Sequence, residues 1–431
     1  MKILLIFAHY GPKHSILQRF LLPSMTLKQL AAIIPSKHEV ELLDERYQTV
    51  DLNWDGDLVG ISCFTYSANH AYYIADEFRK RGKKVILGGY HPSALPEEAK
   101  QHADSVVIGE GETSLPKLLK DVEQGKIKPF YQSPLINPEK IPSAKLVGKD
   151  LTFMAAVQAT RGCPFQCKFC SIHNIEGPYF RPRPIRDVIE EIRNIPQKKI
   201  FFVDSSLTIN PKYTKELFRE MKYLNRIIDC SGNVNVLAKD ETLLNLARDA
   251  GVKRWHVGFE SLSQITINNA GKKSNKIIEY EKAVKKVRDY GMTIIGLFMF
   301  GFDTDTNNVF DTTLNKISEW NLDHVRFSIV TPYPGTRLYE KLDTEGRILT
   351  RNWSLYDSDH VVIRPVNMTP QELYDGTWDT IKRFYSLSQI IRGNVLSKNL
   401  SVQDFLVKGW ENIFTMLFYR SVKKYEGSLC Y

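Results

Sequence analysis

The chain has 431 residues, enough for two or three domains and a large hydrophobic core. With 43% hydrophobic and 25% charged residues it has an ordinary soluble, globular composition, and no apolar run reaches the roughly 18 residues of a membrane span. Six cysteines, three of them in one short motif, do not make a disulfide framework and indicate a reducing cytoplasm. The net charge of +9 allows an anionic partner, but no basic run is dense enough to indicate nucleic acid.

Residues 1–125 alternate short apolar runs with helical patterns. The first run is too short for the core of a signal peptide. The expected strands are Ile3–Phe7, Glu39–Asp44, Leu58–Cys63, Lys84–Gly88 and Ser105–Ile108, and the expected helices are Leu27–Ile34, Ala71–Arg81, Glu97–Ala103 and Leu115–Glu123. This alternation predicts an open, doubly wound (flavodoxin-like) parallel sheet, in which ligands bind beyond the carboxyl ends of the strands.

The loops at those strand ends carry a serine after the third strand and a glycine pair after the fourth. This order, with the string from Gly88 to Glu98 and then Gly109–Glu112, resembles a cobalamin-binding (B12-binding) domain. The resemblance implies cobalamin contacts from His9, Tyr10, Ser62, Thr65, Tyr66, Ser67, Gly88, Gly89, Tyr90, His91, Gly109, Glu110, Gly111 and Glu112.

One departure from that resemblance concerns the cobalt ligand. Cobalamin mutases carry Asp-x-His-x-x-Gly after the first strand, whereas this loop reads Ala8-His-Tyr-Gly-Pro-Lys-His14. The resemblance then implies either that cobalt has no protein histidine ligand or that the domain has lost cobalamin. His9 and His14 are candidate ligands that no motif supports, and solvated loop histidines are the more common case.

Residues 126–150 read as a connector. They hold Pro129, Pro134, Pro138 and Pro142 and show no apolar period, so the domain boundary is expected here.

Residues 151–350 form a second alternating array. Its expected strands are Met154–Ala159, Lys199–Val203, Ile227–Cys230, Arg254–Phe259, Thr293–Phe300 and His324–Val330, each followed by a loop or helix. Such a series predicts a partial (β/α)6 TIM-like barrel with its chemistry at the carboxyl ends of the strands.

Three cysteines follow the first strand of this array. Cys163, Cys167 and Cys170 offer three thiolates, one fewer than a [4Fe–4S] cluster normally takes, so one iron would stay open to a ligand. A zinc site with His173 as fourth ligand, or a disulfide, also fits the cysteines alone. The spacing, with aromatic Phe169 before the last cysteine, resembles the radical S-adenosylmethionine (SAM) family. That resemblance implies a [4Fe–4S] cluster whose open iron binds SAM and cleaves it to a 5′-deoxyadenosyl radical.

Polar residues gather at the ends of the later strands. They are Asp204, Ser205, Ser206, Asn233, Asn235, Glu260, Ser261, Gly301 and Tyr333. The resemblance implies SAM contacts from Phe169, from Asp204, Ser205 and Ser206 at the amino group, from Glu260 at the ribose, and from Ser261 nearby. The family's usual Gly-Gly-Glu on the second strand is absent. A structural ion pair for Glu260 and a loop-capping role for Asp204 are the alternatives.

Arg181, Arg183 and Arg186 flank the helix after the cysteines. Arginine can orient a carboxylate or phosphate, but the pattern predicts solvated surface for at least two of the three.

Residues 351–431 are expected to form a helical C-terminal domain, with helices over Gln371–Leu387 and Asp404–Val422. The last helix has an apolar face and a basic end. Packing on the barrel is the favoured interpretation, and contact with a membrane surface is the alternative.

Together these resemblances imply a cobalamin-dependent radical SAM C-methyltransferase that uses methylcobalamin to methylate an unactivated carbon, with electrons from a flavodoxin- or ferredoxin-like reductant. A radical SAM cyclase, coupling enzyme or oxidoreductase, and a non-catalytic zinc protein, are the alternatives. The substrate class stays open among small molecules, lipids, tetrapyrroles and peptides.

Overall fold

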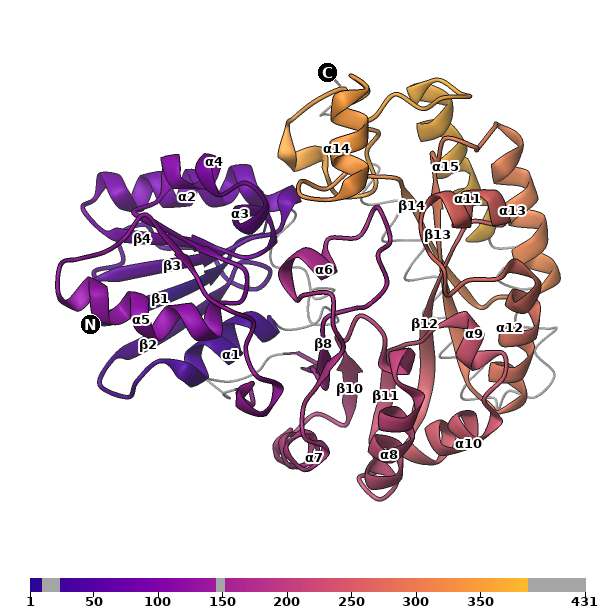
Figure 1. Ribbon diagram of the computed structural model, residues 1–431, viewed down its shortest axis with the longest axis horizontal. Helices are drawn as coiled ribbons and strands as arrows, with labels where there is room; N and C mark the ends of the chain where they lie inside the picture. The colour runs from indigo at the N-terminus through magenta and orange to yellow at the C-terminus, as the bar shows by residue number, and fades with distance from the viewer. Residues whose placement is uncertain (10–23, 145–151, 387–431) are drawn as a thin grey trace.

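The computed structural model describes residues 1–9, 24–144 and 152–386, and it consists of two α/β units side by side (Figure 1). The expected contact residues Tyr10 and His14 and the expected helix Asp404–Val422 lie outside the described residues.

The N-terminal unit is built on a six-stranded parallel sheet with strand order β2-β1-β3-β4-β5-β6. Its inner strand β1 (Lys2–Phe7) is almost wholly buried because helices cover both faces of the sheet. Strand order and burial confirm the doubly wound prediction. The other strands are β2 (Glu39–Asp44), β3 (Leu58–Ser62), β4 (Lys84–Gly88), β5 (Ser105–Ile108) and β6 (Phe130–Gln132).

Two sets of helices cover this sheet. On one face, α1 (Met25–Ile33) packs against α5 (Gly111–Glu123). The other face carries η2 (Thr65–Ser67), α2 (Ala68–Lys80), α3 (Tyr90–Ala94) and α4 (Pro96–His102).

The sixth strand corrects the sequence analysis. β6 comes from the segment predicted to be a connector, and its Phe130 pairs with Val106 of β5. The strand has three residues and forms the sheet edge, so no apolar period of useful length marks it. The short helix η3 (Pro138–Lys140) follows it.

The second unit is the expected partial barrel, again with six parallel strands, in the order β14-β13-β12-β11-β10-β7. Along β13 (Thr293–Phe300) fully buried side chains alternate with partly exposed ones. The buried set packs under the outer helices, and the other set faces the lumen. The remaining strands are β7 (Met154–Val157), β10 (Lys199–Phe202), β11 (Ile227–Ser231), β12 (Val252–Glu260) and β14 (His324–Ile329).

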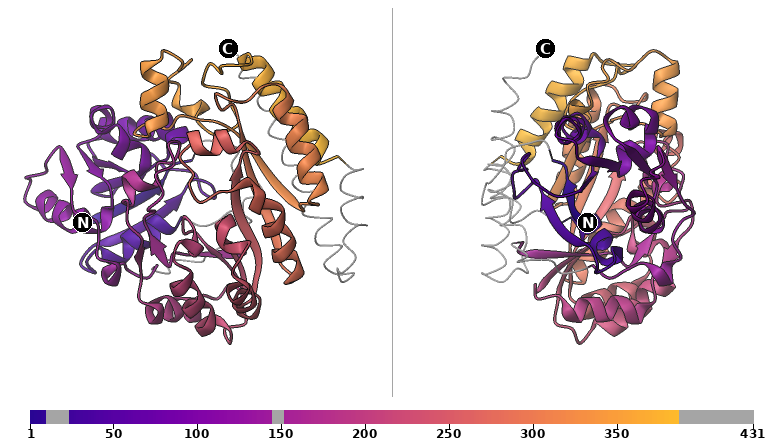
Figure 2. Two further views of the ribbon diagram at one scale, coloured as in Figure 1. Left: turned by 45° about the vertical axis from the view of Figure 1, so that its right-hand side comes forward. Right: turned by 90° about the vertical axis from the view of Figure 1, so that its left-hand side faces the viewer.

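Helices ring the barrel on its outer side (Figures 1 and 2). They are α7 (Ile185–Asn194), α8 (Pro211–Met221), α10 (Glu241–Ala250), α12 (Tyr280–Asp289) and α13 (Asn308–Glu319). The expected C-terminal helix over Gln371–Leu387 is α15 (Pro370–Phe384), which packs against β14 and α13. Shorter elements are α6 (Ile172–Ile175), η4 (Leu207–Ile209), α9 (Val234–Leu237), α11 (Gln264–Asn269), η5 (Ile277–Glu279), α14 (Arg337–Thr344) and η6 (Trp353–Leu355).

The two units share a hydrophobic core. Residues 330–363, which follow the last barrel strand, pack onto the N-terminal sheet's α2 side. Trp353 is buried there, donates from Nε1 to Glu98 Oε1 at 2.9 Å, and lies 5.1 Å from the ring of His91. The segment therefore ties the barrel to the N-terminal unit.

Across the described residues, no helix combines the length and apolarity that crossing a membrane would require.

Candidate functional site

A cavity of 360 Å³ lies where the strand ends of the N-terminal unit meet the barrel. Its walls come mainly from β1, β3, β4, β5, α1 and α5, and the barrel contributes Gln158, Arg161, Ile175, Glu176 and Val203. Sheet topology explains the location, because crevices form beyond the carboxyl ends of parallel strands.

Glycines make room in this cavity. Gly109 has a positive φ of 80° and open space where a side chain would start. Gly60 and Gly88 also line the cavity, and a side chain on Gly60 would collide with Leu5. Deeper in, the walls are apolar (Ile3, Leu5, Leu58, Ile86, Val107 and Leu115). A cofactor that sets a ring against these apolar walls and its amide groups against the polar residues at the strand ends, as cobalamin can, fits such a lining.

The predicted cobalamin contacts divide into two groups. Eight of them line the cavity: Ser62, Gly88, Gly89, Tyr90, Gly109, Glu110, Gly111 and Glu112. The described remainder, His9, Thr65, Tyr66, Ser67 and His91, do not. His91 is fully buried between Glu98 and Trp353, and Ser67 donates to the Phe64 carbonyl, so these two side chains serve packing. His9 Nδ1 lies 3.4 Å from Tyr66 Oη.

The cysteine loop is held at several points by its backbone. Gly162 has a φ of 74°, and a Cβ there would fall 2.1 Å from the Tyr179 carbonyl, so only glycine fits. Its N–H donates to Glu176 Oε2 at 3.1 Å. Further along, Lys168 N–H donates to the Ala270 carbonyl and Cys170 N–H to the Cys167 carbonyl. The antiparallel pair β8 (Thr160–Arg161) and β9 (Arg181–Pro182) closes the loop at its base.

Burial governs the chemistry of the three thiols. It raises the pKa of Cys163, of Cys167 to about 11 and of Cys170 to about 12. Burial therefore disfavours the free thiolates, whereas a bound metal takes the place of the proton.

The donor set suits an iron–sulfur cluster. Among the described residues, no three His, Cys, Asp or Glu side chains converge on one point as a single ion would need. A cluster spreads its thiolates over separate irons, so it needs no such convergence. Cys163, Cys167 and Cys170 offer thiolates, the ligand type that such a cluster takes.

Sequence reasoning missed Lys272, which lies beside the cysteine loop. Its Nζ donates to Glu260 Oε1, and burial alone would lower its pKa, but the Glu260 carboxylate outweighs burial and raises it. The positive charge lowers the pKa of all three thiols against the effect of burial. Glu260 has a φ of 64°, in the left-handed region that residues other than glycine seldom adopt. The ion-pair alternative for Glu260 is therefore what the structure contains, and its contact with SAM stays a prediction.

The Asp204 side chain binds the backbone at the entry of the cysteine loop, and its contact with the amino group of SAM stays a prediction. Its carboxylate is buried and accepts from Ala159 N–H at 3.2 Å and from both Thr160 N–H and Thr160 Oγ1. Burial raises its pKa to about 7, although these hydrogen bonds lower it. Asp204 thus anchors the chain that enters the cysteine loop, which was the capping alternative.

The other predicted SAM contacts lie around the same loop. Ser205 Oγ faces the Gly162 carbonyl at 3.4 Å, whereas Ser206 bonds to Asn233 and Ser261 accepts from Ser263 N–H. Phe169 lines a second cavity of 290 Å³ with Gly301, Phe302 and residues of α11 and α14. Asp305 holds that wall by accepting from the N–H groups of Gly301 and Phe302, both at 3.0 Å.

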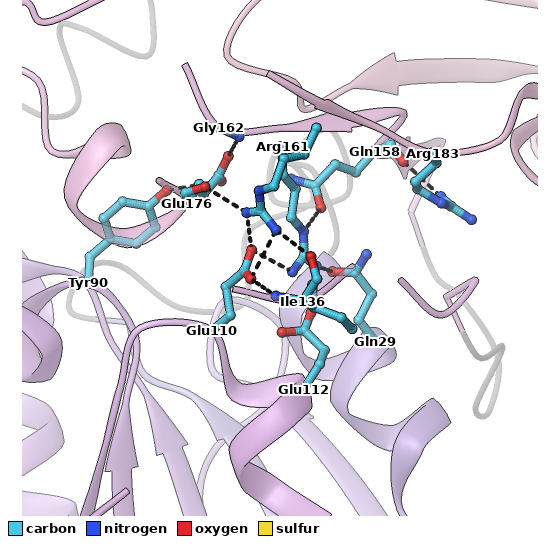
Figure 3. Close-up of polar contacts among 11 residues, drawn as sticks. Gln29, Tyr90, Glu110, Glu112, Ile136, Gln158, Arg161, Gly162, Glu176 and Arg183 are labelled. Atoms are coloured by element: carbon cyan, nitrogen blue, oxygen red, sulfur yellow. Dashed lines mark hydrogen bonds and ion pairs between the residues drawn. The ribbon is translucent and has the colours of Figure 1, made fainter. Parts of the chain in front are cut away.

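A buried ionic network joins the two cavity walls (Figure 3). Arg161, directly before Gly162, pairs with Glu110 at 3.2 Å and with Glu112 at 2.5 Å. Arg181 pairs with Glu110 from the other side, and Glu176 accepts from Tyr90 Oη. The carboxylates predicted to touch cobalamin are therefore bonded to arginines of the cysteine loop.

The prediction of solvated arginines was wrong for two of the three. Arg181 belongs to that network, and Arg183 is 1% exposed and pairs with Glu191 at 2.7 Å. Only Arg186 of this set is exposed. The partner of Arg181, Glu110, lies 71 positions away in the chain and so gave no local signal of this burial.

Comparison with known proteins agrees with this geometry. The model for the radical SAM superfamily matches residues 157–317, and the model for the B12 binding domain matches residues 20–119. The first covers the cysteine loop and most of the barrel, and the second covers β3, β4 and β5 of the cavity wall but not β1.

Curated relatives cover most of the chain. Bacteriochlorophyllide d C-8(2)-methyltransferase of Chlorobaculum tepidum is 34% identical over 80% of this chain and 82% of its own length. The C-12(1)-methyltransferase of the same organism is 31% identical over 84% and 83%. An anaerobic magnesium-protoporphyrin IX monomethyl ester cyclase of Cereibacter sphaeroides is 26% identical over 76% and 60%.

Two solved structures share the fold. The radical SAM methyltransferase TsrM of Kitasatospora setae, with cobalamin and a [4Fe–4S] cluster bound, matches with a TM-score of 0.67 and 16% identity over 80% of this chain and 78% of that chain. OxsB, a cobalamin-dependent radical enzyme with aqua-cobalamin and S-adenosylmethionine bound, matches with a TM-score of 0.69 and 14% identity over 96% and 72%. At these identities the likeness concerns the fold.

Proposed function

Since this chain belongs to the radical SAM superfamily, among its members with an N-terminal B12-binding domain, we propose that it is a cobalamin-dependent C-methyltransferase that acts on a tetrapyrrole. The two relatives at 34% and 31% identity are named for bacteriochlorophyllides, which supports the tetrapyrrole.

One observation carries the proposal: the glycine-lined cavity of the N-terminal unit opens against the segment that leads into the cysteine loop. Arg161 and Glu176 are walls of that cavity and, at the same time, neighbours of Gly162. Methyl transfer to an unactivated carbon needs the radical source and the methyl donor beside one substrate, and this juxtaposition supplies that proximity.

In this proposal the bound groups supply the hard chemistry, a 5′-deoxyadenosyl radical from cluster and SAM and a methyl group from cobalamin. The chain's residues hold and shield them. Cys163, Cys167 and Cys170 hold the cluster, Asp204 and Glu176 fix the loop on either side, and Lys272 offsets the negative charge that the thiolates bring.

The cysteines test the cluster assignment. Cys167→Ala should lower iron well below about four per chain and abolish dithionite-driven SAM cleavage, because the cluster loses one of its three ligands. Cys230→Ala is the matched control, since Cys230 is buried in the barrel core away from the motif. Iron analysis and chromatography of 5′-deoxyadenosine give the answer. Retained cleavage in the Cys167 variant refutes the assignment.

A cyclase is the second candidate function, supported by the 26% identity to a tetrapyrrole cyclase. Both candidates use a tetrapyrrole and SAM, so the product separates them. A methyltransferase adds the methyl carbon of labelled SAM to the product, whereas a cyclase product carries no label.

A further inference from the structure

Gln29 of α1 is a buried amide with one end unused. Its side chain is 3% exposed, and its Oε1 accepts from Arg161 Nη2 at 3.0 Å. Its Nε2 finds no acceptor among the described residues. An unpaired buried N–H group costs about 1–3 kcal/mol, so a partner is expected in the functional state.

The orientation of this amide is forced. Arginine can only donate hydrogen bonds, so the oxygen of Gln29 must face Arg161 and the NH2 group must point the other way. Arg161 is itself immobilised, because its remaining N–H groups reach Gln158, Glu110 and Glu112. Figure 3 shows the Gln29 nitrogen turned away from Arg161. The donor is therefore held in one direction before any ligand arrives.

Gln29 lines the cavity between the two units, together with Glu110, Glu112 and Arg161. Those three charged side chains are bonded to one another, whereas the buried NH2 group of Gln29 has no acceptor among the described residues. A cofactor placed there meets a neutral donor beside a neutralised ionic cluster. Cobalamin, with its many amide carbonyls and its phosphate, offers matching acceptors.

We infer that Gln29 is a cobalamin-binding residue, donating from Nε2 to an oxygen of the cofactor while Arg161 holds its other end. The inference rests on the proposed function, in which this cavity takes cobalamin. In this arrangement the cofactor, Gln29 and Arg161 form one hydrogen-bonded unit. Arg161 is the residue directly before Gly162 of the cysteine loop.

The test is equilibrium binding of hydroxocobalamin to the full chain at pH 8, after removal of any cobalamin carried through purification and with the cluster reconstituted. Gln29→Met removes both ends of the amide. Gln29→Glu keeps an acceptor for Arg161 but, as a carboxylate, has no N–H to donate. Gln101→Met, an exposed change at the end of α4 outside the cavity, is the control.

Both Gln29 variants should bind hydroxocobalamin about fivefold or more weakly than the wild type, the effect of one lost hydrogen bond, and Gln101→Met should match the wild type. Iron content equal to wild type shows that the variants fold. If Gln29→Met binds hydroxocobalamin within twofold of the wild type, the inference is overturned. It is also overturned if Gln29→Glu binds as tightly as the wild type, because the contact with Arg161 alone would then account for any loss of affinity in Gln29→Met. A wild-type chain that binds no hydroxocobalamin refutes the cobalamin part of the proposed function and the inference with it.

Discussion

Charged side chains around the cysteine loop each have a specific neighbour. Lys272 is paired with Glu260, Arg161 with Glu112, and the Asp204 carboxylate with Thr160. Burying a charge costs free energy unless the charge is paired or hydrogen-bonded. These contacts therefore stabilise the cysteine loop in its folded conformation. Burial raises the pKa of the Asp204 carboxyl to about 7.

Asp204 should make stability depend on pH in a specific direction. Its folded pKa of about 7 lies above the ordinary value, so the unfolded chain releases this proton first and stability falls as pH rises from about 4 to about 7. Each pKa unit of the shift corresponds to about 1.4 kcal/mol.

Asp204→Asn should remove that dependence. The difference in unfolding free energy, wild type minus variant, should therefore decrease between pH 5 and pH 8 in denaturant titrations. A difference that grows with pH would mean that the native carboxyl is stabilised in its ionised form.

At the residue scale, the sequence predicted the cysteines because their spacing is itself the signal. It also predicted four glycines of the cavity wall, Gly88, Gly89, Gly109 and Gly111, but not Gly60. Lys272 and Gln29 were not predicted, since each acts on residues distant in the sequence and neither belongs to a motif. Asp204 and Glu260 were placed at the correct strand ends. Their hydrogen-bonding partners, Thr160 and Lys272, could not be predicted from the spacing of residues in the sequence.

The cysteine loop is an element fixed from both units of the protein. From the barrel, Ala270 and Glu176 bind its backbone. From the N-terminal unit, Glu110 and Glu112 hold Arg161. These last contacts join residues about 50 positions apart in the chain, so the loop's position depends on the two units being packed together.

Arg161→Met should destabilise the protein by about 3–5 kcal/mol, because it leaves Glu112 buried without its cation. A double-mutant cycle with Glu112→Gln should give a coupling energy of about 0.5–3 kcal/mol, measured by denaturant unfolding. Arg186→Met is the matched control, since Arg186 is exposed, and it should stay within about 0.5 kcal/mol of wild type. If the effects of Arg161→Met and Glu112→Gln on the free energy of unfolding simply added, Arg161 and Glu112 would not interact directly.

At the element scale, most strands of both sheets were predicted within a residue or two, because buried parallel strands read as unbroken apolar runs. β6 was missed because it is short and lies at the sheet edge. The ion pairs of Arg181 and Arg183 were missed because charged residues near a loop are usually solvated.

The whole molecule behaves as one packing unit. Residues 330–363 bury Trp353, Tyr356 and Val362 in the core of the N-terminal sheet. The cavity and the cysteine loop also lie between the two units, and residues of both units line the cavity. Separating the two units would therefore disrupt the site. Sequence analysis predicted the two units but had no means to predict which faces meet, because the pairing rests on contacts such as Trp353 with Glu98, 255 positions apart.

Trp353→Ala should therefore destabilise both units together. The loss of a buried tryptophan typically costs about 3–5 kcal/mol. Wild type and variant should each unfold in a single calorimetric transition, at a lower temperature in the variant. Tyr223→Ala, which changes an 85% exposed side chain, is the control. Two transitions, with only one shifted by the substitution, would show that the units are independent.

The central claim is that the cavity and the cysteine loop serve one reaction. It is tested most directly by mass spectrometry after cluster- and cobalamin-loaded protein reacts with dithionite, bacteriochlorophyllide d and SAM whose methyl group carries three deuterium atoms. We predict a methylated tetrapyrrole that retains all three deuterium atoms, with 5′-deoxyadenosine and S-adenosylhomocysteine in equal amounts. Intact SAM and unlabelled tetrapyrrole, from protein shown to hold both cofactors, would contradict the account.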